Sequence, residues 1–121
     1  MTTTTQNMLT NVEFGQASGN YDGSSQLFYS DAVPAANYYG GNGNIQTLFY
    51  NLSNFVGTIT IQATLNDLPD QAHWFDISER GDAETPESGL TSATVTGNFS
   101  WLRARVAGFD GGTITGVYEV Y

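Results

Sequence analysis

Two stretches of the chain have side chains that alternate in character, strictly so in the first, and this alternation restricts the fold more than any other feature of the sequence. Within residues 56–65 the apolar positions of the alternation are Ile59, Ile61, Ala63 and Leu65. Residues 99–106 repeat the pattern, with Leu102, Ala104 and Val106 alternating with Trp101, Arg103 and Arg105. Because successive side chains of a strand point to opposite faces, both stretches predict β-strands buried on one side.

Shorter segments elsewhere have the composition of strands and are separated by turn residues. Threonine, valine, isoleucine and aromatic residues favour strands, whereas glycine, asparagine and aspartate favour turns. We therefore expect further strands at residues 25–30, 45–50, 74–77, 91–96 and 113–121. Turns are expected at residues 40–44, 51–54, 66–70 and 110–112, the last as a hairpin turn. The sequence leaves room for one helical turn, at residues 67–72.

These seven or eight short strands, with a turn about every ten residues, predict an all-β fold: a single antiparallel β-sandwich of the jelly-roll type. A length of 121 residues is that of one domain, which we assign to residues 11–121. Residues 1–10 include four consecutive threonines and predict a flexible N-terminal arm, mobile or ordered by a partner. The end of the last strand, residues 117–121, is a candidate for completing a neighbour's sheet.

Charge and composition exclude several function classes. The chain has no cysteine and no lysine, so it has no disulfide, thiol nucleophile, cysteine zinc site or phosphate-binding lysine. Three arginines against 12 acidic residues give a net charge of −9, which argues against nucleic-acid binding. No apolar run approaches the ~20 residues of a membrane span, and the N-terminus lacks the features of a signal peptide.

The polar residues do not form a recognisable catalytic motif. His73 is the single histidine, and a Ser-His-Asp triad would also need a serine elbow of the Gly-x-Ser-x-Gly type, which is absent. Five acidic residues between positions 76 and 87 lack the spacing of a calcium loop and indicate a solvated acidic loop. The sequence therefore predicts no catalytic residue, no metal site, no cofactor and a protein that is not an enzyme.

Arginine and aromatic side chains are the candidates for binding. Trp101, Arg103 and Arg105 share one strand face, where the arginines form either salt bridges within the chain or ion pairs between subunits. Four other aromatic residues either line the core, pack on a neighbouring subunit or stack on a sugar: Tyr38, Tyr39, Trp74 and Tyr121. We expect a partner or oligomer interface at Trp101, Arg103, Arg105, Tyr121, Tyr38 and Tyr39.

Part of the sequence resembles a known family. The segments concerned are GTITIQATL at residues 57–65, WFDI at 74–77 and VTGNFSWLRARV at 95–106, followed by Phe109, residues 112–115, Val117 and Tyr121. Their order resembles small β-sandwich virion proteins of tailed bacteriophages, of the head-decoration or tail-accessory type. The resemblance covers roughly residues 56–121, and its motifs are strand and turn patterns, so it carries over no active site.

The resemblance implies a non-enzymatic structural protein of the virion. We expect it to be made in the host cytoplasm, and to decorate or cement the capsid exterior through contacts with the major capsid protein or other virion subunits. Homo-oligomers of such proteins are symmetric, and a trimer is one option. A tail or baseplate accessory protein, or a carbohydrate-binding module that recognises the host receptor, remains the alternative.

Overall fold

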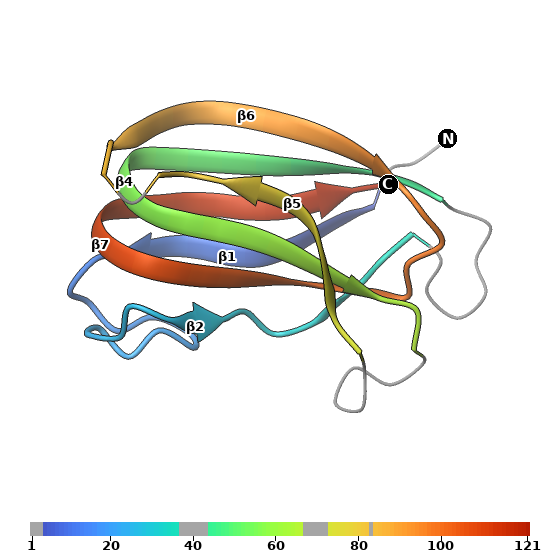
Figure 1. The fold of residues 1–121 in the computed structure, drawn as a ribbon, viewed down its shortest axis with the longest axis horizontal. Coiled ribbons are helices and arrows are strands. Elements are labelled where there is room, and N and C mark those ends of the chain that lie inside the picture. Colours follow the sequence, from blue (N-terminus) through green and yellow to red (C-terminus); the bar gives the residue numbers. More distant parts are fainter. Residues whose placement is uncertain (1–3, 37–43, 67–72, 83) are drawn as a thin grey trace.

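The computed structural model describes residues 4–36, 44–66, 73–82 and 84–121, and these residues form an all-β structure (Figure 1). Their strands are β1 (Thr5–Glu13), β2 (Phe28–Tyr29), β3 (Val33–Pro34), β4 (Ile45–Thr64), β5 (Phe75–Arg80), β6 (Glu87–Thr96) and β7 (Trp101–Val120). All the pairings between strands are antiparallel. The prediction of an all-β antiparallel fold is confirmed, and the sheet folds over itself as a β-sandwich does.

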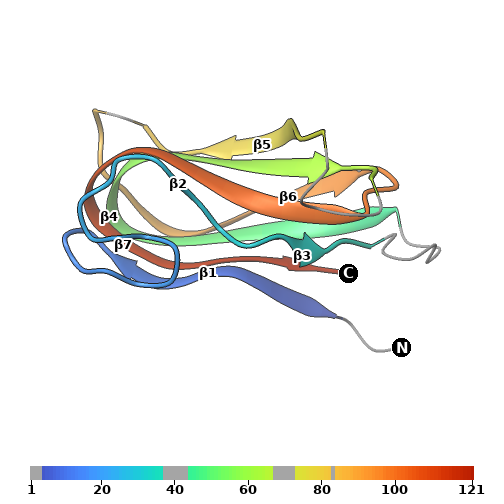
Figure 2. The same cartoon turned by 90° about the horizontal axis from the view of Figure 1, so that it is seen from below.

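Two long, bent strands build both layers of the sandwich. β4 and β7 each have 20 residues and pair with each other from Thr47–Val120 to Thr64–Trp101. Both strands turn back at the same end of the molecule, which is clear at the left of Figure 1. The first layer therefore runs β1, the C-terminal half of β7, the N-terminal half of β4 and β6. The second layer runs β2 and β3, the other half of β7, the other half of β4 and β5 (Figure 2).

The bends replace two of the predicted turns. Residues 51–54 and 110–112 were expected to end their strands, but they lie inside β4 and β7. Positive φ angles at Asn54 (53°) and Gly112 (82°), together with register shifts between Asn51 and Thr58, let each strand bend sharply. Because both strands bend at the same place, their antiparallel pairing resumes beyond the bend. Turn residues therefore produce bulges here rather than hairpins.

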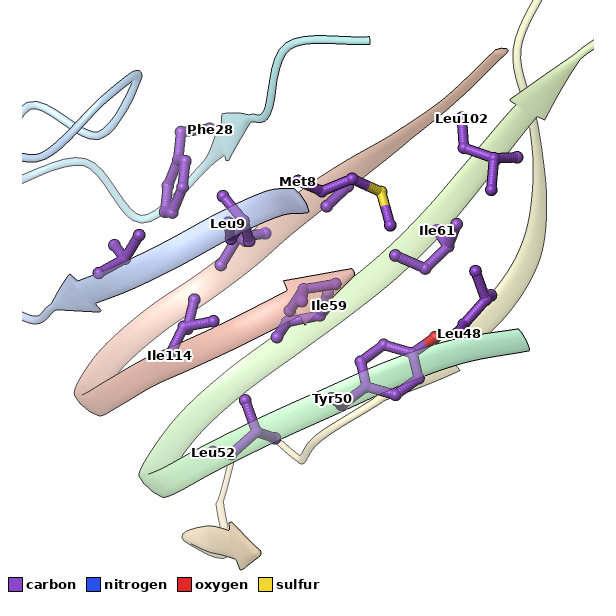
Figure 3. Packing of buried hydrophobic residues seen from close by; sticks show 14 of the residues in the cluster. Met8, Leu9, Phe28, Leu48, Tyr50, Leu52, Ile59, Ile61, Leu102 and Ile114 are labelled. Atoms are coloured by element: carbon purple, nitrogen blue, oxygen red, sulfur yellow. The ribbon is translucent and has the colours of Figure 1, made fainter. Parts of the chain in front are cut away.

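The alternating residues form the core between the two layers, as predicted. Every inward side chain of the two stretches from Ile59 to Ala63 and from Leu102 to Val106 is fully buried. These side chains face residues of the first layer that include Leu48, Tyr50, Leu52 and Ile114 (Figure 3). Leu65 is the exception, because β4 ends at Thr64 and leaves this side chain 62% exposed.

An aromatic cluster centred on Phe109 closes the bent end of the sandwich. The ring of Phe109 lies 5.1–6.0 Å from the rings of four others, namely Phe14, Tyr21, Phe28 and Phe55. Phe14 and Tyr21 come from the loop between β1 and β2, and Phe28 comes from β2, so the loop is packed against the core. The strand expected at residues 25–30 is correspondingly reduced to the two residues of β2.

The N-terminal segment is part of the sheet, so the prediction of an arm over residues 1–10 is wrong for residues 5–10. β1 pairs with β7, and Thr4 and Tyr121 exchange backbone hydrogen bonds of 2.7 and 2.9 Å. Met8 and Leu9 are buried, and their burial outweighs the polar, low-complexity composition around them. The same pairing places residues 117–120 between β1 and β4, so this segment has no free edge to offer to a neighbour.

Candidate functional site

The outer face of the second layer carries the arginines singled out by the alternation. Trp101, Arg103 and Arg105 point outward from β7, and each is half-buried. Neighbouring strands add side chains on both sides of Arg103. We call this surface the arginine face and define it by Tyr29, Gln62, Trp74, Asp76, Arg103 and Arg105.

Arg103 lies between two aromatic rings. Its guanidinium carbon is 4.5 Å from the ring centroid of Tyr29 and 4.4 Å from that of Trp74. A cation at this distance is attracted by the electron-rich face of each ring, an interaction of about 0.5–1 kcal/mol at exposed sites. Burial lowers the pKa of the Arg103 guanidinium, and the neighbouring Tyr29 acts in the opposite direction. The guanidinium stays charged at neutral pH all the same, because arginine titrates far above it.

A row of hydrogen bonds across three strands fixes the orientation of Arg103. The Nε–H of Arg103 on β7 donates to Oε1 of Gln62 on β4 over 2.8 Å. The Nε2 of Gln62 in turn donates to Oδ1 of Asp76 on β5 over 3.0 Å. Gln62 lies directly opposite both residues in the register of the sheet. The guanidinium is therefore held by two rings and one amide, with the carboxylate of Asp76 one residue further away.

The sequence left open whether Arg103 and Arg105 form salt bridges within the chain. Within the part of the chain that the structure describes, neither Arg103 nor Arg105 pairs with a carboxylate. The ion pair found there joins Arg80 to Glu87 at 2.8 Å, at the bent end of the molecule. Arg105 lies opposite Tyr29 and Thr60 in the sheet.

The other predicted interface residues lie in different places. Trp101 is at the open end of the same face, opposite Thr64 and Pro34. Tyr121 closes the end of the first layer, where its hydroxyl donates to the carbonyl oxygen of Pro34 over 3.2 Å. Burial raises the pKa of Tyr121, as does the neighbouring Glu119 carboxyl, whereas a hydrogen bond with Gln6 lowers it.

Tyr38 and Tyr39 lie outside the described residues, as does the helical turn expected at residues 67–72.

Sequence reasoning missed Tyr29, Gln62 and Asp76 as parts of this face. Gln62 was on the polar side of an alternating strand, and this position alone was a signal that it faces outward. Tyr29 and Asp76 carry no such signal, because they reach Arg103 only through the register of strands far apart in the sequence.

Glu119 is a second unexpected feature, inside the sandwich. Its side chain is fully buried, and neither carboxyl oxygen has a hydrogen-bond partner among the described residues. Burial raises the pKa of this carboxyl to about 8. The neutral form therefore predominates at pH 7. Position 119 alternates with buried Val117, a pattern that would have revealed its inward orientation.

The acidic run and the histidine lie at the surface. Glu79, Asp82 and Glu87 line a shallow hollow of about 420 Å³ that also contains Arg80. The described residues include no group of three or more histidine, cysteine or acidic side chains placed to hold a metal ion. His73 is exposed, and its backbone N–H donates to Oδ1 of Asn66. Nowhere in the described chain is a helix long and apolar enough to cross a membrane.

Comparison with known proteins adds no family to this description. No protein-family model matches the chain, and a search of curated proteins finds no match either.

Proposed function

We propose that the chain is a non-enzymatic structural protein of a tailed-bacteriophage virion, which decorates or cements the capsid exterior by binding neighbouring subunits through the arginine face. The observation that carries the proposal is the position of Arg103 between the rings of Tyr29 and Trp74. The virion itself is proposed from the resemblance of residues 56–121 to small β-sandwich proteins of phage particles.

The arginine face has the composition of a binding hot spot. Arginine, tryptophan and tyrosine are the residue types enriched among side chains that dominate the energy of protein interfaces. Because the rings and Gln62 already hold Arg103 in place, binding costs little of its side-chain entropy. A guanidinium with a fixed plane suits a carboxylate or a row of backbone carbonyls on the partner. The partner that fits best is therefore a protein subunit with acidic or carbonyl groups at its surface.

Co-sedimentation with phage particles tests the proposed position of the protein in the virion. Native particles would be purified and the copy number of the protein measured by quantitative mass spectrometry. Hundreds of copies per particle support capsid decoration, and a few to dozens would overturn it in favour of a tail or baseplate position. A protein that remains in the soluble fraction would overturn the virion proposal itself.

A matched pair of variants tests whether Arg103 contributes to binding. Arg103→Gln and Arg80→Gln each remove one positive charge, but only the first lies on the arginine face. We expect Arg103→Gln to weaken binding to stripped capsids at least tenfold, and Arg80→Gln to bind as the wild type does. Equal binding by all three proteins would overturn the assignment of the interface.

A carbohydrate-binding module is the second candidate, favoured by one observation. Trp74 and Tyr29 lie beside the amide of Gln62 and the carboxylate of Asp76, a combination that also suits a sugar ring. Against it, Arg103 already covers one face of each aromatic ring. Titration with bacterial surface glycans, followed by tryptophan fluorescence, separates the two: saturable quenching that Trp74→Ala abolishes would favour the sugar-binding module.

A further inference from the structure

The two layers end in four outer edges, three of which are protected against pairing with another chain. Unpaired edges attract further strands, and proteins commonly block them with charges, bulges or very short strands. β5 carries three charged residues, Asp76, Glu79 and Arg80. β2 and β3 have two residues each. β1 has a bulge between Asn7 and Leu9 and a positive φ at Asn11.

The fourth edge, β6, has such devices only at its start, where Glu87 is charged, Gly89 has a φ of 110° and the register with β4 shifts. From Leu90 to Thr96 it contains no charged residue, no proline and no glycine, and its pairing with β4 is unbroken. In the described part of the chain β4 is its one partner strand. β6 forms the upper border of the molecule in Figure 1. Leu90 lies near the start of β6 and is 60% exposed, and Ile45, which lies opposite Thr96 on β4 at the other end, is 58% exposed.

The backbone of β6 presents an ordered row of hydrogen-bonding groups. The N–H of Gly97 donates to the carbonyl oxygen of Asn44 over 2.7 Å, at the end of the ladder between β6 and β4. Bonded and non-bonded pairs alternate along an antiparallel ladder, so Val95, Ala93 and Thr91 also bond to β4. The backbone N–H and C=O groups of the residues between them therefore point away from β4: Leu90, Ser92, Thr94 and Thr96.

We propose that β6 pairs with β6 of a second copy of the chain, antiparallel and about a two-fold axis at Ala93. In this register Ser92 lies opposite Thr94 of the second copy, and Leu90 lies opposite Thr96. Each outward N–H and C=O group then meets its counterpart, because a two-fold interface joins identical surfaces. The first layers of the two copies become one continuous sheet.

Charge and apolar exposure favour a second copy as the occupant. The chain carries a net charge of −9, so two copies repel each other over most of their surface. Residues 88–96 are uncharged, and Glu87 at the start of β6 is paired with Arg80, so this edge is a place where two acidic copies can meet. The same register brings exposed Leu90 to the face that carries Ile45 of the second copy. The pairing involves the first layer and leaves the arginine face on the second layer free.

Substitution at Ser92 tests the pairing without cutting the ladder to β4. Proline at this position removes an outward N–H and places its ring at the edge, whereas alanine keeps the N–H. We expect the wild type and Ser92→Ala to sediment at twice 13.1 kDa at high micromolar concentration, and Ser92→Pro to sediment as the monomer. Circular dichroism melts check that all three are folded. A monomeric wild type, a trimer, or a folded Ser92→Pro dimer would each overturn the proposal.

Cysteine cross-linking provides a second test that does not depend on proline being tolerated. The natural chain has no cysteine, so each introduced thiol is unique. Opposite residues of an antiparallel pair have Cα atoms about 5.5 Å apart, within the range of a disulfide. Mixed Ser92→Cys and Thr94→Cys copies should form a disulfide-linked dimer under mild oxidation. Thr47→Cys, one strand in from the edge, should not, and equal cross-linking by this control would overturn the pairing.

Discussion

Leu48 and Glu119 lie directly opposite each other on β4 and β7, and both side chains are inaccessible to solvent. A carboxyl group is therefore buried beside a leucine of the core, with no hydrogen-bond partner among the described residues. Such a group is far less costly in its neutral form than as a carboxylate. Its protonation thus becomes part of the stability of the fold.

The free energy of unfolding should fall as the pH rises from about 5 to 8. The pKa of Glu119 is raised from 4.5 to about 8 in the folded protein, so the folded state holds a proton that the unfolded state releases. The stabilisation is complete below the unfolded pKa and is lost as the pH rises through the folded one, at about 1.4 kcal/mol per pH unit. Urea denaturation at pH 5, 6.5 and 8 measures this slope.

Glu119→Gln should flatten this dependence and make the protein more stable than the wild type at pH 8. Gln6 lies opposite on β1 and Tyr121 is the neighbouring titratable group, so both should be kept unchanged in the comparison. Asp110→Asn removes an exposed carboxyl of the same strand and should keep the wild-type slope. A wild-type stability that does not vary between pH 5 and 8 would contradict the prediction.

Arg103→Lys should destabilise the fold by about 1–2 kcal/mol, even though the charge is kept. An ammonium group cannot lie flat between Tyr29 and Trp74, and it lacks the Nε–H that reaches Gln62. Arg105→Lys should change the stability by less than about 0.5 kcal/mol. The midpoints of chemical denaturation of the two variants measure this difference. Equal effects of the two substitutions would show that the stacked geometry contributes nothing to stability.

Gly112→Ala should cost about 2–4 kcal/mol, whereas Gly111→Ala should be close to neutral. Gly112 has a φ of 82°, and a Cβ atom there would overlap the carbonyl group of Asn54 across the bend. At Gly111 the same atom would meet Val56 at an ordinary contact distance of 3.6 Å. Thermal unfolding of the two variants compares adjacent glycines directly. A tolerated Gly112→Ala would mean that the bend can relax.

The sequence predicted which faces are buried far better than how the strands connect. The alternation from Ile59 to Ala63 and from Leu102 to Val106 gave both the core and the outward position of Arg103, because side-chain direction is local. The residues at 110–112 gave a correct signal for a change of direction. Whether the chain then reverses or only bends depends on β4, a strand far away in the sequence, so no local pattern could decide it.

The arginine face was predictable only in part, for the same reason. Parity along β7 placed Trp101, Arg103 and Arg105 together, but the rings that hold Arg103 come from β2 and from the residue just before β5. The position of β1 was missed because a threonine-rich composition hid its buried residues, Met8 and Leu9. Glu119 was missed because its charge, taken alone, indicates a surface position.

The shared strands β4 and β7 also determine how the protein folds and unfolds. Each runs through both layers, so neither layer can unfold without disrupting strands that also belong to the other layer. Pairs such as Thr47 with Val120 form only after most of the chain has been brought together, which makes folding dependent on distant contacts and therefore slow. Amide protons of both layers should then exchange through one global opening rather than through separate partial ones.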